Sequence, residues 1–532
     1  GLVNWGTGTN TYASWTFRKA PKFFDVVTWT GDGTGARTIS HNLGATVGAL
    51  FMKATNAAMQ WFSYHNGLTN SQFLELNATT SAVSSINAWN NTTPTSTEFS
   101  VGSYGNVSGR TYVAYLFAHN DGDGEFGPDG DQDIIKCGSY TGNGSNDGPE
   151  IDLGFEPQWV MIKSTDIVGN WLIHDNMRGL TLTSTNLLLA NESLAEITGS
   201  YTAVSPNATG FKIGVTGTDW NSSSSDYIYI AIRRGPLAVP EDATEVFAIE
   251  QSDGTSVPSF NAGFPIDAAL LRATTISNGS LRSRLTGNGF LETNNTDDEG
   301  SNAFTKWDYQ DSWYDDNISS SYYSWMWKRA PGYFDVVAYT GNGTAGRTVS
   351  HNLGVAPEMM WVKSRDLGDS IRNWCVYHTG TGNTKSSFLN LTDASVASIN
   401  FWNNTNPTDA VFSLGAANAV NTSGEDYIAY LFASAPGVSK VGSFSHTYGS
   451  DTTVDCGFSS GTRFVIIKRS SDSGDWMVFD TERGIVAGND ARLLLNSSGA
   501  EATNSDNIDP NSSGFVFTGA NGGGTYIFYA IA

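Results

Sequence analysis

A long repeat with a constant offset constrains this chain more than any other feature of its sequence. The run from Phe24 to Gly44 contains Phe-Asp-Val-Val, Thr-Gly-Asp-Gly and His-Asn-Leu-Gly, and it returns from Phe334 to Gly354. Both end residues are displaced by 310 positions (334 − 24 and 354 − 44). A fainter copy begins at Tyr140. Units of roughly a hundred residues have the size of sandwich domains and exceed the ~20–50 residues of solenoid repeats. The sequence therefore predicts a tandem array of domains.

Five units align on a glycine that each of them contains. These glycines are Gly44, Gly154, Gly263, Gly354 and Gly457. The expected divisions are the closing strand of a truncated preceding unit (1–20), unit 1 (21–119), an acidic Gly/Asp linker (120–133), unit 2 (134–236), a divergent unit 3 (237–331), unit 4 (332–434) and unit 5 (435–532). Unit 4 repeats unit 1, and unit 5 repeats unit 2. The short connections between units predict a stiff rod.

Composition and patterning predict an all-β fold. Aromatic residues make up 12% of the chain and charged residues only 15%, with 58 glycines. Each unit closes on an apolar strand, such as residues 227–232, whose two faces are both apolar, and Thr-Gly-Asn-Gly segments are typical turns between strands. Short helical turns are expected only near residues 81–86 and 395–399. The predicted architecture is a tandem array of five β-sandwich domains of about 100 residues each.

The first residues repeat the end of unit 3. Residues 12–21 match residues 322–331, again with an offset of 310. We therefore expect the chain to be a fragment of a longer polypeptide, with donation of this strand to another domain or subunit as the alternative. A strand alone would leave its backbone hydrogen-bonding groups unpaired.

Charge and motif content exclude several classes of function. A net charge of −23 without a basic run is the opposite of what a nucleic-acid partner requires. Cys137, Cys375 and Cys456 fall at unmatched places in the repeat, which indicates neither a shared disulfide nor a cysteine metal site. No apolar run reaches the ~18 residues of a membrane helix. Because the motifs of serine hydrolases, zinc proteases and phosphate loops are absent, we expect no enzyme activity and no membrane insertion.

The linker at residues 120–133 is a candidate calcium site. Its carboxylates, interleaved with glycines, are Asp121, Asp123, Asp129, Asp131 and Asp133. Carboxylate oxygens on a flexible backbone suit Ca²⁺, although the spacing does not fit an EF-hand. The alternative is a solvated hinge. Apart from this possible ion, no cofactor is expected.

A repeated Trp-Asn-Asn motif is a candidate glycan site. Its residues are Trp89, Asn90 and Asn91, repeated as Trp402, Asn403 and Asn404. A tryptophan could stack on a sugar ring while neighbouring amides bond its hydroxyls. The favoured alternative is a packed loop in which the tryptophan fills the sandwich edge and the asparagines cap turns.

Two histidines of unit 1 recur in unit 4. His41 and His65 correspond to His351 and His378, but Asp175 stands in place of His65 in unit 2. We therefore expect a buried or hydrogen-bonding role for these histidines, in preference to catalysis or metal binding.

These motifs resemble the uncharacterised β-rich repeat domains of virion structural proteins from marine tailed phages. The resemblance rests on Phe334-Asp-Val-Val-Ala-Tyr-Thr-Gly-Asn-Gly, on His-Asn-Leu-Gly followed by a Trp-Val-Lys strand, and on Ile135-Lys-Cys-Gly-Ser-Tyr-Thr-Gly-Asn-Gly. Units 1, 2 and 4 match well and unit 5 in part, whereas unit 3 lacks the Thr-Gly-Asn-Gly turn.

The resemblance implies lectin-like or jelly-roll β-sandwich domains in an extracellular virion component, namely a tail fibre or similar surface appendage. Such a protein is a homo-oligomer, commonly a trimer, that contacts other virion proteins and can bind a host surface glycan. The expected function is therefore host attachment without catalysis. The alternatives are a virion decoration without a ligand, a self-assembling extracellular filament and a bacterial surface adhesin. A polysaccharide depolymerase would need a catalytic carboxylate pair, which the sequence alone does not single out.

Overall fold

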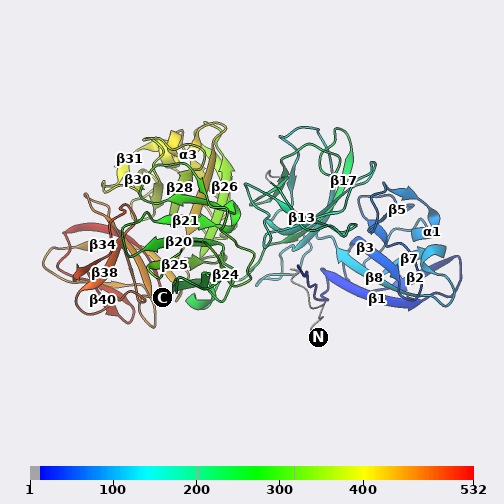
Figure 1. Ribbon diagram of the computed structural model, residues 1–532, viewed down its shortest axis with the longest axis horizontal. Helices are drawn as coiled ribbons and strands as arrows, with labels where there is room; N and C mark the ends of the chain where they lie inside the picture. The colour runs from blue at the N-terminus through cyan, green and yellow to red at the C-terminus, as the bar shows by residue number, and fades with distance from the viewer. Residues whose placement is uncertain (1–11, 200–202, 317) are drawn as a thin grey trace.

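A computed structural model describes residues 12–199, 203–316 and 318–532, and Figure 1 shows its arrangement. Across these residues the chain forms five six-stranded antiparallel sheets, each accompanied by a smaller sheet of two or three strands. The all-β tandem array of sandwich units expected from the sequence is confirmed. None of the helices in the described ranges combines the length and the apolar character needed to cross a membrane.

Units 1 and 2 have large sheets with the same strand order. In unit 1 the order is β1 (Phe24–Thr30), β8 (Thr111–Ala118), β3 (Val47–Ala54), β4 (Phe62–His65), β5 (Gln72–Glu75) and β6 (Val83–Ser84), with β2 (Ala36–Ser40) and β7 (Glu98–Gly102) in the small sheet. In unit 2 it is β9 (Ile135–Thr141), β17 (Asp226–Arg233), β11 (Pro157–Ser164), β12 (Leu172–Asp175), β13 (Asn186–Leu189) and β14 (Ile197–Thr198), with β10 (Glu150–Asp152), β16 (Gly210–Ile213) and β15 (Val204–Asn207) in the small sheet.

Units 3 and 4 repeat this order. Unit 3 contains β18 (Phe247–Gln251), β25 (Tyr322–Trp327), β20 (Ala268–Ala273), β21 (Ser280–Ser283), β22 (Gly289–Glu292) and β23 (Gly300–Ser301), with β19 (Phe260–Asn261) and β24 (Ser312–Trp313) in the small sheet. Unit 4 contains β26 (Phe334–Thr340), β33 (Asp426–Phe432), β28 (Met359–Ser364), β29 (Cys375–His378), β30 (Lys385–Phe388) and β31 (Val396–Ala397), with β27 (Arg347–Ser350) and β32 (Val411–Leu414) in the small sheet. The sequence of unit 3 diverges, but its topology does not.

Unit 5 has the same plan. It contains β34 (Ser439–His446), β42 (Gly524–Ile531), β36 (Phe464–Arg469), β37 (Trp476–Asp480), β38 (Asp490–Leu494) and β39 (Ala502–Ser505), with β35 (Thr452–Asp455), β41 (Gly514–Phe517) and β40 (Ile508–Asn511) in the small sheet. The short helices of the described residues are α1 (Ile86–Trp89), α2 (Ile399–Trp402) and α3 (Asn418–Asn421), with 3-10 turns η1 (Ser103–Gly105), η2 (Ala243–Glu245) and η3 (Arg284–Thr286). In every large sheet the closing strand lies between the first strand and the third.

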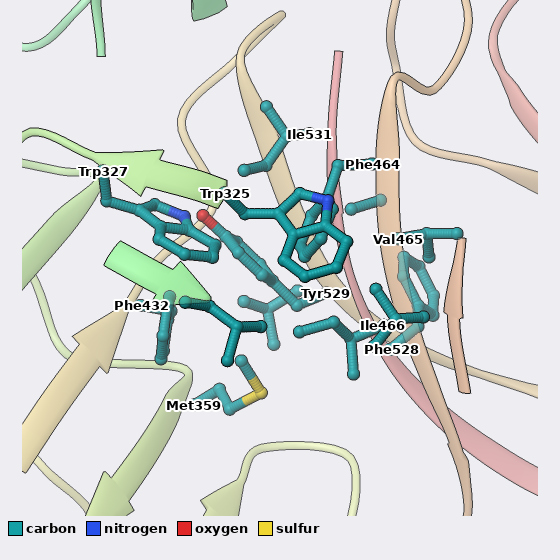
Figure 2. Packing of buried hydrophobic residues seen from close by; sticks show 14 of the residues in the cluster. Trp325, Trp327, Met359, Phe432, Phe464, Val465, Ile466, Phe528, Tyr529 and Ile531 are labelled. Atoms are coloured by element: carbon teal, nitrogen blue, oxygen red, sulfur yellow. The ribbon is translucent and has the colours of Figure 1, made fainter. Parts of the chain in front are cut away.

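The large sheets of units 3, 4 and 5 share one core. One face of the unit 4 sheet packs on its own small sheet, through Tyr339 and Phe412 for example. The opposite face enters a cluster that also holds residues of units 3 and 5. Figure 2 shows Trp327 of unit 3, Phe432 of unit 4 and Phe464 of unit 5 in this cluster. Both faces of the closing strand are therefore buried, which explains why both faces of these strands are apolar.

A basic residue near the end of the third large-sheet strand joins each of these units to a neighbour. Its side chain is buried and donates hydrogen bonds to backbone carbonyls of the adjacent unit. The bonds are Lys363 Nζ to Thr296 O (3.1 Å, unit 4 to unit 3), Lys468 Nζ to Thr392 O (2.8 Å, unit 5 to unit 4) and Arg272 Nη2 to Ser497 O (3.0 Å, unit 3 to unit 5). Unit 3 thus contacts unit 5, and the three units form a closed cycle, which we call the three-unit ring.

A second set of side chains, two tryptophans beside the start of the fourth strand and one threonine after the fifth, repeats the same cycle. Trp374 Nε1 donates to Glu292 O of unit 3 at 2.9 Å, and Trp476 Nε1 donates to Phe388 O of unit 4 at 2.8 Å. In unit 3, where the tryptophan is missing, Thr293 Oγ1 donates to Leu495 O of unit 5 at 2.8 Å. The expectation of a stiff rod is therefore wrong for units 3–5, because contacts between unit 3 and unit 5 close the array on itself.

A buried ionic cluster joins unit 2 to the three-unit ring. Arg329 donates from Nη1 to Glu156 of unit 2 at 2.8 Å, with a second bond from Nη2, and from Nε to Asp335 at 2.7 Å. Arg234 lies within 3.6–3.9 Å of Glu156, Asp267 and Asp335. Burial by itself lowers the pKa of Arg329, but the surrounding carboxylates raise it above its ordinary value. The same guanidinium, with burial opposing it, holds the pKa of Asp335 below the ordinary value.

The predicted closing strand at the start of the chain is described from residue 12, and residues 1–11 lie outside the described ranges. Residues 12–19 form no strand, and Ala20 makes an isolated bridge to Phe24. Trp15 and Phe17 are half-buried against the core that units 1 and 2 share.

Candidate functional site

The Trp-Asn-Asn motifs form helix ends. Trp89 is the last residue of α1, and Asn90 follows as its C-cap with φ 52°, followed by Asn91 with φ 49°. Asn403 and Asn404 adopt the same angles after α2. Asparagine tolerates this left-handed conformation better than most residues, which explains the paired amides.

The two tryptophans have no free ring face for a sugar. Trp89 is 2% exposed and Trp402 is 0% exposed. Their Nε1 groups donate to Gln72 O and Lys385 O, both at 3.0 Å. The predicted stacking role for Trp89 and Trp402 is therefore corrected, because burial in the sandwich core leaves no room for a ligand, while Asn91 and Asn404 stay exposed.

The acidic linker folds as a loop whose carboxylates are spread apart. Asp133 accepts from the backbone N–H groups of Gly122 and Gly124, both at 2.8 Å. Lys136 lies 3.5 Å from Asp121, and Lys22 lies 3.2 Å from Glu125 and 3.8 Å from Asp123, while Asp129 and Asp131 are exposed. Within the described residues no three metal-ligating side chains come together, and the calcium site at these aspartates stays a prediction.

Two of the four repeated histidines, His65 and His378, contact a neighbouring unit through their side chains. His65 Nε2 lies 3.0 Å from Tyr229 O of unit 2, and His378 Nε2 lies 3.2 Å from Phe528 O of unit 5. Burial lowers the pKa of both imidazoles to about 4. Both rings are therefore neutral near pH 7.

A polar groove between unit 2 and unit 4 is the best candidate for a ligand site. Its cavity volume is about 400 Å³, within the ~300–1,000 Å³ typical of small-molecule sites. The β15–β16 hairpin forms one wall, strands β26 and β27 form the other, and Asn352 Nδ2 of unit 4 donates to Ala208 O of unit 2 at 2.9 Å. The uncharged polar side chains that line it are Ser205, Asn207, Thr209, Thr340, Thr348 and Ser350.

Two of the cationic groups in the groove already have partners. Lys212 pairs with Asp147 at 2.5 Å, and Arg365 pairs with Glu299 through two bonds of 2.8 Å. Arg347 is different. Its guanidinium lies 5.4 Å from the centre of the Tyr339 ring and donates to Thr340 O, and no ion pair within 4.0 Å links it to a described carboxylate.

The equivalent arginine of unit 1 shows what Arg347 lacks. Arg37 lies 3.7 Å from Asp32 and donates to Thr30 O at 2.5 Å. The position equivalent to Asp32 is Asn342 in unit 4 (342 − 32 = 310), so no carboxylate stands there. Burial lowers the pKa of Arg347, but a guanidinium remains charged near pH 7. The groove thus combines hydroxyl and amide groups, the carboxylates of Glu150 and Asp426, and the Arg347 guanidinium, which has no ion pair with a described carboxylate.

Sequence reasoning missed this groove because its walls come from units that lie far apart in the chain. The difference between Asp32 and Asn342 was visible in the repeat and could have drawn attention to Arg347. Nothing in the sequence placed the β15–β16 hairpin beside unit 4.

Comparison with known proteins places the chain in a family. Residues 9–236 and residues 267–532 match the family described as "Domain of unknown function (DUF7483)". No curated protein matches the chain. The second matched segment contains most of unit 3 together with units 4 and 5, and the first contains units 1 and 2. Because the two segments cover most of the 532 residues, the chain belongs to the DUF7483 family.

Proposed function

We propose that this protein is a non-catalytic structural component of a phage particle, a tail fibre or similar surface appendage, that contributes to host attachment by binding a glycan. The phage assignment rests on the sequence resemblance. The attachment role rests on the groove between units 2 and 4, which offers hydroxyl, amide and guanidinium groups in about 400 Å³. Glycans present many hydroxyl groups, which such side chains can bond.

Rigid walls favour binding in this groove. The Arg329–Glu156 contact fixes unit 2 against the three-unit ring, so both walls are in place before a ligand arrives. Preorganisation reduces the entropic cost of binding. A homo-oligomer, such as the trimer expected from the resemblance, would present several grooves and gain avidity.

The first test is glycan binding by the full chain, with Arg347→Gln and Arg37→Gln as a matched pair. We expect a glycan bound by the parent chain to bind at least about tenfold more weakly to Arg347→Gln, since a hydrogen bond to a charged group contributes ~1.5–3 kcal/mol. Arg37→Gln removes the equivalent residue of unit 1 outside the groove and should bind like the parent.

Other outcomes separate the alternatives. If the chain binds no glycan on a glycan array, a virion decoration or filament with no ligand is favoured. Release of sugar from host polysaccharide would identify a depolymerase. If Arg347→Gln and Arg37→Gln weaken glycan binding equally, the groove is not the glycan site. Detection of the chain in purified phage particles by mass spectrometry tests the virion assignment, and its recovery from a bacterial surface would favour an adhesin.

A further inference from the structure

Units 1 and 2 meet through the same contacts as units 4 and 5. Lys163 Nζ donates to Thr79 O at 3.3 Å, as Lys468 does to Thr392 O at 2.8 Å. Trp171 Nε1 donates to Glu75 O at 3.0 Å, as Trp476 does to Phe388 O at 2.8 Å. One of the three contacts of a three-unit ring is therefore already present between units 1 and 2.

Among the described residues, no third unit covers the face of unit 1 that corresponds to the contact with unit 3. In unit 4, Lys363, Trp374 and Tyr430 lie against unit 3 and are at most 1% exposed. Their equivalents in unit 1 are Lys53, Trp61 and Tyr115, and all three are only half-buried. Lys53 Nζ donates to Met59 O of its own unit, and its ammonium lies 5.8 Å from the Trp61 ring.

The face of unit 2 that corresponds to the contact with unit 3 holds Trp15. Trp15 Nε1 donates to Asp175 at 3.0 Å, and the Arg178 guanidinium lies 5.2 Å from the Trp15 ring. In the three-unit ring, Trp325 of β25 donates to Asp480 at 3.0 Å, with Arg483 at 5.3 Å from its ring. Trp15 therefore occupies, on unit 2, the position that Trp325 of the unit 3 closing strand occupies on unit 5.

Phe17 repeats the position of Trp327. Its ring lies 6.1 Å from that of Trp159 at an interplanar angle of 82°, and Trp327 lies 5.7 Å from Phe464 at 79°. In unit 3, Trp325 pairs with Ile249 on one side and Leu270 on the other. Residues 12–19 keep the outward and inward alternation of such a strand but form no ladder with any described residue.

We propose that the half-buried face formed by Lys53, Trp61 and Tyr115, together with the adjoining Asp175 and Arg178 that hold Trp15, is a docking surface for a further β-unit of the unit 3 type, with residues 12–17 as its closing strand. Units 1 and 2 would then form a second three-unit ring with this occupant. In all five sheets the closing strand follows the body of its own unit, so a body supplied for a test belongs directly before this strand.

A second copy of the described chain is a poorer occupant. Each of its five large sheets already contains a closing strand between its first and third strands. Inserting residues 12–17 of another copy would require one of these strands to leave. A unit without its own closing strand has the matching vacancy, and its two flanking strands would pair the backbone groups of residues 13–17, which form no ladder with any described residue.

The test is a graft that places residues 237–321, the body of unit 3 without β25, directly before Tyr12 in place of residues 1–11. Hydrogen exchange of the backbone amides of residues 13–17 is measured in the grafted and parent chains. We expect these amides to exchange about 100-fold or more slowly in the graft, approaching residues 323–327 of the same molecule. In the parent chain they should exchange as an unpaired segment.

Matched lysine variants provide a second readout. Lys363→Met should lower the unfolding midpoint of the parent chain, whereas Lys53→Met should leave it nearly unchanged. In the grafted chain Lys53→Met should lower the unfolding midpoint as much as Lys363→Met does.

Three results would overturn the proposal. The first is equal exchange of residues 13–17 in the graft and the parent chain. The second is an unfolded graft, since it carries everything of unit 3 except the strand that residues 12–17 are proposed to replace. The third is protection of residues 12–17 that rises with concentration of the parent chain, which would assign the face to a second copy.

Discussion

Replacing Arg329 by methionine should separate unit 2 from the three-unit ring. Arg329 is 3% exposed, and its guanidinium bonds both Glu156 and Asp335. Methionine keeps much of the side-chain volume but leaves both carboxylates buried. Arg234, at 3.6 Å from Glu156 and 3.9 Å from Asp335, is then the remaining cation near both.

The expected cost is large because only one partner of a buried ionic network is removed. Such changes destabilise proteins by ~3–5 kcal/mol. The equivalent pair near the start of the chain supplies the control. Lys19 lies 2.6 Å from Asp25, but the lysine side chain is 58% exposed. An ion pair whose cation stays in water contributes less, ~0–1 kcal/mol, and the buried Asp25 keeps its bonds from the N–H groups of Val26 and Asn42, so Lys19→Met should have the smaller effect.

Urea unfolding followed by tryptophan fluorescence measures both free energies. We expect Arg329→Met to lose at least about 2 kcal/mol more than Lys19→Met. Small-angle scattering below the transition should also show unit 2 moving away from units 3–5 in Arg329→Met alone. If the two variants lose the same free energy, the reasoning that burial distinguishes these equivalent pairs is wrong.

Two further predictions concern the histidines and the buried tryptophans. Burial in the folded chain lowers the pKa of His65 and His378 to about 4. Because these histidines have a pKa near 6.5 in the unfolded chain, the unfolded chain binds protons more strongly. The free energy of unfolding should therefore be at its full value above about pH 6.5 and fall by up to about 3 kcal/mol per histidine toward pH 4. Urea titrations at pH 7 and 4.5 check this, and a slope unchanged in His378→Gln would contradict it. Trp402→Ala should cost ~3–5 kcal/mol of stability without a specific loss of glycan affinity, and loss of binding in a variant of parental stability would contradict its assignment to the core.

Local features of the fold could be predicted from the sequence because they depend on residues close together in the chain. The Thr-Gly-Asn-Gly turns and the alternating strands mark individual sheets. The helical turns were expected a few residues too early, since α1 and α2 begin at Ile86 and Ile399. Their ends are fixed by Asn90 and Asn403, whose left-handed backbone was not part of the prediction.

Contacts between units could not be predicted in this way. The basic residue that closes the third strand is visible in every unit, but its acceptors are backbone carbonyls. Any residue can supply a backbone carbonyl, so the sequence of the acceptor carries no matching signal. The groove and the Arg329 cluster depend on the same placement of units, and they escaped prediction for the same reason.

The apolar closing strands indicate a second covering layer, which the sandwich interpretation did not include. A sandwich sheet with one face toward water alternates apolar and polar residues, whereas Tyr427, Ile428, Ala429 and Tyr430 are all buried. A sandwich covers only one face of such a strand, so a second covering layer is required. In unit 4 the three-unit ring provides it. In unit 1 the equivalent strand β8 leaves Tyr115 half-buried, and the further unit proposed to dock there would cover this apolar outer face.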